Sequence, residues 1–123
     1  MGSNDALEGL KVLLVEDEAL IALDLGAALR KAGCRVVGPA PGVEQALRVI
    51  AAEEADVALL DVNLGGEEIF PVADELARRG IPFVFLTGYG RDALPERFRD
   101  RPTSPKPYSA KPLLVQLGTV AGR

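Results

Sequence analysis

Val57-Ala58-Leu59-Leu60-Asp61 is the stretch that decides the fold prediction, because an apolar run leads straight into a carboxylate. A carboxylate inside a buried strand would be costly, so we expect Asp61 at the strand's exit. The same pattern occurs at residues 10–15, which lead into Glu16-Asp17-Glu18, and at residues 81–86, which lead into Thr87-Gly88. The carboxyl ends of parallel strands meet at the edge where open α/β sheets bind ligands. We therefore predict that these polar residues gather at one sheet edge.

Apolar runs and helical spacing alternate along the chain, which is typical of strand–helix units. Strands are predicted at residues 10–15, 35–38, 56–60, 82–86 and 101–106, and helices at residues 20–32, 43–50, 69–76 and 113–120. Short connections between such units imply parallel strands with helices on both faces. We predict an α/β fold with a three-layer, doubly wound sheet of five parallel strands. The expected order is the flavodoxin-like 2-1-3-4-5, in a (βα)5 chain with a short or irregular fourth helix.

The residues between the predicted strands and helices indicate where loops, helix starts and a helix break lie. Residues 39–42 are expected to form a loop, and Glu67 and Glu68 to lie in the first turn of the third helix, where the helix dipole favours carboxylates. Leu94-Pro95 interrupts any long helix, so we expect only a short, mobile helix at residues 95–98. Ser109 is the expected N-cap of the last helix.

Length and composition fit one domain with a single core. We predict a single domain over residues 1–123, with residues 1–6 as a disordered tail or a cloning remnant. No apolar run approaches the roughly 18 residues of a membrane span, and the first residues do not form a signal peptide. The 14 basic and 18 acidic residues are interspersed and leave a net charge of −4, so we expect no direct DNA binding and no membrane partner.

Cysteine and histidine usage narrows the chemistry. Cys34 is the only cysteine, so no internal disulfide forms, which fits a reducing, cytoplasmic location. The chain contains no histidine. This excludes Ser-His and Cys-His nucleophile pairs and the usual imidazole zinc sites.

Glu16, Asp17 and Asp61 form the first candidate site. The first and third strands are neighbours in the predicted order, so these acids should converge at the carboxyl edge of the sheet. Carboxylates that lie so close together repel one another unless a hard cation neutralises them. Mg²⁺ fits, because it prefers a few carboxylates together with water and phosphate oxygens. The alternative is that residues 16–18 simply cap the first helix.

Thr87 and Lys106 extend this site. The Thr87 hydroxyl would suit an anionic oxygen, and Lys106, held between two prolines, would supply a positive charge. The alternatives are a turn threonine and a surface lysine. Lys111 is a competing match, but Lys106 is preferred because the chain from Leu113 onward must already be helical. A nucleophilic carboxylate, a Mg²⁺ pair, a hydroxyl and a lysine together make a phosphoryl-transfer site.

Four motifs in this order resemble those of response-regulator receiver domains (CheY-like), over nearly the whole chain. They are Val15-Glu16-Asp17-Glu18, Leu59-Leu60-Asp61-Val62-Asn63-Leu64, Leu86-Thr87-Gly88 and Lys106-Pro107-Tyr108. The resemblance implies that Asp61 is the phosphoacceptor, and that Glu16 and Asp17 bind Mg²⁺ with Asp61 and the backbone carbonyl of Asn63. It also implies that Thr87 contacts the phosphoryl oxygen and that Lys106 forms an ion pair with it.

Residues 82–90 are also similar to a receiver subgroup with a Phe-Ala-Thr-Gly-Tyr-like motif. That subgroup is known mainly from alphaproteobacterial stress signalling and includes single-domain regulators; here Leu86 replaces its alanine. Most receivers carry a switch aromatic or apolar residue three positions before the lysine, where this chain has Thr103. We expect Tyr89 to replace it as the switch. Prolines in the fifth strand weaken the ladder there.

The resemblance implies a two-component or phosphorelay signalling protein. Since the chain has no histidine, its phosphoryl group must come in trans, from a sensor histidine kinase, a histidine phosphotransfer protein or a small phosphodonor. Phosphorylation adds about −1.5 to −2 charge and would shift residues 88–108. The shift would change the binding of a downstream protein on the face formed by the fourth helix, fifth strand and fifth helix. Only self-phosphorylation and dephosphorylation are expected, not turnover as an enzyme.

Other interpretations remain open. The chain could be the receiver of a hybrid kinase or larger regulator. A Mg²⁺-dependent aspartyl-phosphate hydrolase generally has a second acid two residues after the nucleophile, where this chain has Asn63. A pseudo-receiver that serves only as a binding module is disfavoured by the complete set of acids, threonine and lysine. A flavodoxin-like cofactor binder would need a phosphate-binding loop where residues 16–18 are acidic.

Overall fold

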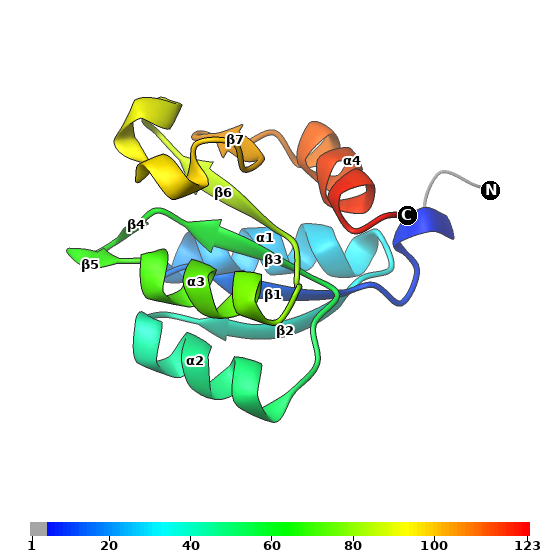
Figure 1. Ribbon diagram of the computed structural model, residues 1–123. Helices are drawn as coiled ribbons and strands as arrows, with labels where there is room; N and C mark the ends of the chain where they lie inside the picture. The colour runs from blue at the N-terminus through cyan, green and yellow to red at the C-terminus, as the bar shows by residue number, and fades with distance from the viewer. Residues whose placement is uncertain (1–4) are drawn as a thin grey trace.

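The computed structural model describes residues 5–123 and contains a five-stranded parallel sheet of order β2-β1-β3-β6-β7 (Figure 1). Its strands are β1 (Lys11–Val15), β2 (Arg35–Ala40), β3 (Val57–Asp61), β6 (Phe83–Thr87) and β7 (Thr103–Pro105). All four neighbouring pairs are parallel. Because β4 and β5 form a separate small hairpin, this is the predicted order 2-1-3-4-5, and the prediction is confirmed.

Helices cover both faces of the sheet (Figure 1). Helices α1 (Ala19–Lys31) and α4 (Ala110–Val120) pack on one face, and α2 (Val43–Ala52) and α3 (Phe70–Arg78) on the other. Successive strand residues point to opposite faces, so the central strands must be apolar throughout. Leu13 accordingly lies in the core under α2 and α3, and Leu14 in the core under α1. The three-layer prediction is confirmed, and polar residues are left at the strand ends.

The connection between β6 and β7 contains no α-helix. Two 3-10 turns, η2 (Arg91–Ala93) and η3 (Glu96–Phe98), take its place, separated by the predicted break at Leu94-Pro95. Phe98 packs into the core, and the Arg97 guanidinium donates two hydrogen bonds of 3.0 Å to Asp74 on α3. The short, irregular fourth helix is confirmed, and this segment is anchored on α3.

The chain after Asp61 corrects one prediction. Glu67 and Glu68 do not belong to the third helix; they form β5 (Glu67–Glu68), paired antiparallel with β4 (Asn63–Leu64). The cause is Gly65-Gly66, whose φ angles of +57° and +96° suit the two-residue turn of a tight hairpin. Helix α3 begins only at Phe70, with a proline in its first turn.

The second strand also differs from the prediction. β2 continues to Ala40, whereas residues 39–42 were expected to form a loop. Gly38 has a φ of +96° and is followed by a cis bond to Pro39, and the register with β1 shifts there before Ala40 pairs with Val15. Proline is tolerated because β2 is an edge strand.

The two ends of the chain complete the fold. Asp5–Leu7 form the 3-10 turn η1, which includes the last two residues of the predicted tail, while residues 1–4 lie outside the described residues. Leu7 is buried in the core between α1 and α4. At the other end β7 keeps three of the six predicted residues, and Ser109 occupies the N-cap of α4 as predicted, without a side-chain cap bond.

Candidate functional site

Three carboxylates meet at the carboxyl edge of the sheet. Val15 of β1 pairs with Leu60 of β3, so the residues that follow each, Glu16 and Asp61, leave the sheet side by side. Glu16, Asp17 and Asp61 each offer a carboxylate oxygen, and these oxygens lie within 4.8 Å of one another. The predicted convergence is confirmed.

Asp61 is the most enclosed of these acids, with 1% of its surface exposed. The Lys106 Nζ lies 2.9 Å from its carboxylate oxygens. The backbone amide of Asn63 donates a 3.0 Å hydrogen bond to Asp61 Oδ1. The lysine and the amide hold the carboxylate in one orientation at the strand exit, and the lysine offsets the cost of burying its charge.

Glu16 is 2% exposed, and within residues 5–123 only one of its two carboxylate oxygens accepts a hydrogen bond. Its Oε2 accepts a 3.1 Å hydrogen bond from the Glu18 amide, while Oε1 has no hydrogen-bond partner among the described residues. Burial raises the pKa of Glu16 to about 8, and the neighbouring Asp61 acts in the same direction. A buried carboxylate oxygen without a donor, next to two further carboxylates, fits a hard divalent cation such as Mg²⁺.

Thr87 and Lys106 bound the other side of the site. Thr87 ends β6 and is buried; its Oγ1 accepts a 3.0 Å hydrogen bond from the Tyr89 amide. Thr87 pairs with Pro105 of β7, and the Lys106 amide donates to the Thr87 carbonyl at 3.0 Å. Burial lowers the pKa of Lys106, but hydrogen bonding and charge attraction to Asp61 outweigh it, so the pKa is raised. The lysine beside Asp61 is thus Lys106, whereas Lys111 lies in the first turn of α4.

Tyr89 lies at the rim of the site. It is 68% exposed, and it contacts Thr87 through its backbone, in the hydrogen bond from its amide and another to its carbonyl. A hollow of about 250 Å³ lies at the carboxyl end of β6, beside β7, and is lined by Thr87, Tyr89, Ser104 and Lys106 among others. Thr103, in the usual position of the switch aromatic, is half-buried in β7.

The structure adds residues that sequence reasoning missed. The tip of the β4–β5 hairpin lies against the acids, since a Cβ built on Gly65 would be 2.9 Å from Asp17 Oδ2. The Tyr108 hydroxyl donates a hydrogen bond to Asp24 of α1, which ties the Lys106 loop to that helix. The Gly-Gly pair was a usable signal for the hairpin; nothing in the sequence linked Asp24 with Tyr108.

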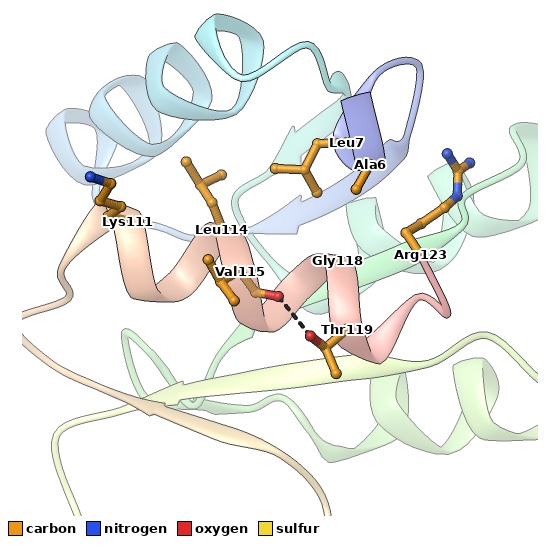
Figure 2. A pocket seen from close by; sticks show the side chains of 8 residues that line it. All are labelled: Ala6, Leu7, Lys111, Leu114, Val115, Gly118, Thr119 and Arg123. Atoms are coloured by element: carbon orange, nitrogen blue, oxygen red, sulfur yellow. Dashed lines mark hydrogen bonds between the residues drawn. The ribbon is translucent and has the colours of Figure 1, made fainter. Parts of the chain in front are cut away.

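An apolar hollow of about 280 Å³ lies elsewhere on the molecule, between η1 and α4 (Figure 2). Leu7, Leu114 and Val115 line it, with Lys111 and Arg123 toward its ends (Figure 2). None of the three clustered carboxylates takes part in it. The clustered carboxylates therefore lie at the carboxyl edge of the sheet and not in this hollow.

Comparison with known proteins identifies the family. The sequence model of the response regulator receiver domain matches residues 12–101. The solution structure of SdrG from Sphingomonas melonis Fr1 is 40% identical, with a TM-score of 0.78 over 94% of this chain and 98% of SdrG. The receiver domain of PhyR from Erythrobacter litoralis is 25% identical, with a TM-score of 0.81 over 94% of this chain and 92% of that one.

The curated relatives that this chain matches are longer than the chain itself. The transcriptional regulatory protein PdtaR from Mycobacterium tuberculosis is 32% identical over 97% of this chain, which spans 60% of the length of PdtaR. No α-helix of residues 5–123 is long and apolar enough to span a membrane. The chain belongs to the response regulator receiver domain family, whose members are the phosphoacceptors of two-component signalling.

Proposed function

We propose that Asp61 takes up a phosphoryl group from a phosphohistidine donor in trans, and that residues 1–123 act as one receiver domain. The observation that carries this proposal is the buried Asp61 carboxylate, paired with Lys106 at 2.9 Å and flanked by two further acids. A buried nucleophile next to a fixed positive charge is the arrangement that phosphoryl transfer needs.

The transfer is a single displacement. An Asp61 carboxylate oxygen attacks the phosphorus, a new O–P bond forms, and the N–P bond to the donor imidazole breaks in line. The electron pair of that bond leaves with the imidazole, and Asp61 becomes an acyl phosphate. Lys106 holds a positive charge beside the phosphoryl oxygens, and Thr87 provides a hydroxyl at the same edge. No residue of this chain can be the phosphohistidine donor, because its sequence contains no histidine.

Receiver domains bind Mg²⁺ at an acidic pocket, and the acids of this chain fit that ion. Glu16, Asp17 and Asp61 would hold it together with the backbone carbonyl of Asn63, and the unpartnered Glu16 Oε1 supports this assignment. When bound, Mg²⁺ neutralises the clustered carboxylates and the incoming phosphoryl oxygens. The family resemblance and the hard oxygen donors favour Mg²⁺ over transition metals.

The signal passes through residues 88–108. Drawing Thr87 and Lys106 toward a phosphoryl group would change the hydrogen bonds between Thr87 and Tyr89 and between Lys106 and Thr87. Tyr89 is the proposed switch, since it is exposed and lines the hollow at the carboxyl end of β6. The output partner is a protein that binds the face made by the β6–β7 connection, β7 and α4. No direct contact with DNA is part of this proposal.

The donor is a sensor histidine kinase or a histidine phosphotransfer protein, which places the chain in the cytoplasm. The same site serves a receiver inside a longer regulator, and the relatives include both single-domain and longer proteins. Turnover of a free phosphate ester is not proposed. Asn63 stands two residues after Asp61, where a hydrolase would need a second acid.

The test is phosphoryl uptake from a small acyl-phosphate donor, followed by intact-mass spectrometry. The wild-type chain should gain one phosphoryl group in the presence of Mg²⁺ and lose the capacity with a chelator. Asp61→Asn should gain none, whereas Asp100→Asn, an exposed acid in the β6–β7 connection, should behave as wild type. Labelling of Asp61→Asn at the wild-type level would overturn the assignment.

A further inference from the structure

The hairpin that follows Asp61 joins the candidate Mg²⁺ site to a helix of the opposite layer. On its first strand, the backbone amide of Asn63 donates a hydrogen bond to Asp61 Oδ1. At its tip, Gly65 lies so close to Asp17 that a Cβ there would be 2.9 Å from Oδ2. Leu64 is buried in the core between β3 and α3 and fixes the hairpin's base. The hairpin thus contacts two of the three clustered acids.

On its second strand the hairpin contacts the start of α2. Glu67 Oε1 accepts a 3.2 Å hydrogen bond from the amide of Val43, the first residue of α2. The N-cap residue of α2 is Gly42, which has no side chain to cap the helix. A Cβ on Gly42 would lie 2.8 Å from Gln45 Oε1 and 2.9 Å from Glu67 Oε1, so the glycine leaves the space that these two side chains occupy. Glu67 therefore caps α2 from another element, as an acid at a helix N-terminus can.

Glu67 pairs with Leu64 in the hairpin register, and Leu64 lies between Asn63 and Gly65 in the sequence. A displacement of Glu67 therefore moves the residues that contact Asp61 and Asp17. We propose that Glu67 is a positioning residue of the Mg²⁺ site, because its bond to Val43 holds the hairpin against the acids. This inference rests on the proposed function, since it assumes that these acids bind Mg²⁺.

The coupling must work in both directions. If the Glu67–Val43 bond favours Mg²⁺ binding, Mg²⁺ binding must strengthen that bond by the same factor. The Val43 amide should then exchange its hydrogen more slowly when Mg²⁺ is bound. This readout reports on α2 rather than on phosphoryl transfer.

The experiment is a Mg²⁺ titration of the full chain followed by ¹⁵N NMR, with hydrogen exchange of the Val43 amide. Glu67→Ala should bind Mg²⁺ about fivefold more weakly, the factor expected for the loss of one helix cap. Glu67→Gln keeps the oxygen acceptor and should stay within about twofold of wild type. Glu68→Ala is the matched control, since it removes the same charge from the same strand and its side chain has no hydrogen bond or ion pair among residues 5–123.

Gly42→Ala tests the same contact from the other side. The Gly42 backbone is extended, so alanine fits the conformation, but its methyl group would meet the side-chain oxygens of both Gln45 and Glu67 and force Glu67 to move. It should weaken Mg²⁺ binding in wild type and have little further effect in Glu67→Ala.

The outcomes separate the inference from the function on which it rests. Equal Mg²⁺ affinities for Glu67→Ala and Glu68→Ala, or a Val43 amide that exchanges at the same rate with and without Mg²⁺, would overturn the inference. Both results leave the phosphoacceptor role of Asp61 intact. Failure of the wild-type chain to bind Mg²⁺ would instead contradict the proposed function.

Discussion

Lys106 and Asp61 form an ion pair with an N–O distance of 2.9 Å across 45 residues of sequence, and the Asp61 side chain is 1% exposed. The lysine follows β7 and the aspartate ends β3, with β6 between these strands. The pair therefore spans the carboxyl edge of the sheet. It is the contact that the uptake of a phosphoryl group by Asp61 has to rearrange.

Replacing this lysine should destabilise the protein. Lys106→Met leaves the buried Asp61 carboxylate beside Glu16 without a counter-charge, and we expect a loss of about 2 to 3 kcal/mol in the free energy of unfolding. Urea denaturation in the presence of a chelator measures it. Lys111→Met is the control, since that lysine is exposed and should change stability by less than about 0.5 kcal/mol. Equal effects of the two variants would show that the ion pair contributes nothing.

Glu16 makes the stability of the metal-free protein depend on pH. Its pKa is raised by burial from 4.5 to about 8, so the folded state holds this proton more tightly than the unfolded chain does. The free energy of unfolding is therefore unaffected by this group below pH 4.5 and falls as the pH rises toward 8. Glu16→Gln should remove this part of the decline and be more stable than wild type at pH 8 in the presence of a chelator.

Denaturant titrations at several pH values measure this difference. Glu18→Gln removes an exposed acid two residues away and serves as the control. Parallel stability curves for wild type and Glu16→Gln across this pH range would contradict the prediction.

Asp24 and Tyr108 should be energetically coupled. The Tyr108 hydroxyl donates to Asp24, and burial together with this bond raises the pKa of Tyr108 to about 12. The phenol therefore stays protonated and able to donate at neutral pH. We expect a coupling free energy of about 1 kcal/mol in a double-mutant cycle of Asp24→Ala and Tyr108→Phe. Strict additivity of the two substitutions would mean that the bond does not stabilise the fold.

Gly65 and Gly66 offer a matched pair for the metal site. Both have positive φ angles, so alanine at either position should cost about 1 kcal/mol of stability. Only at Gly65 would the methyl group meet an acid, since nothing lies within 4 Å of a Cβ on Gly66. Gly65→Ala should therefore weaken Mg²⁺ binding in a calorimetric titration, and Gly66→Ala should not. Equal affinities for both variants would show that the hairpin tip does not bear on Asp17.

Much of this architecture could be predicted because parallel strands impose it. Once residues 10–15 and 57–60 are assigned to neighbouring strands, the sheet itself brings Glu16 and Asp61 together. The hairpin was missed because glutamates before an apolar helical stripe favour a helix N-terminus, while the turn formed by Gly65-Gly66 decides otherwise. The Asp24–Tyr108 bond joins residues 84 positions apart on different elements, so no local pattern indicates it.

Phosphorylation-dependent switching at Asp61 can be tested by titrating the chain with Mg²⁺ and beryllofluoride, which mimics an acyl phosphate, and following the amide signals by NMR. We expect shifts around Asp61 that extend through Thr87, Tyr89 and Lys106 into α4 and that require both reagents. They should be absent in Asp61→Asn. Shifts confined to the neighbourhood of Asp61 would contradict the proposed switch, and identical shifts in Asp61→Asn would contradict the site.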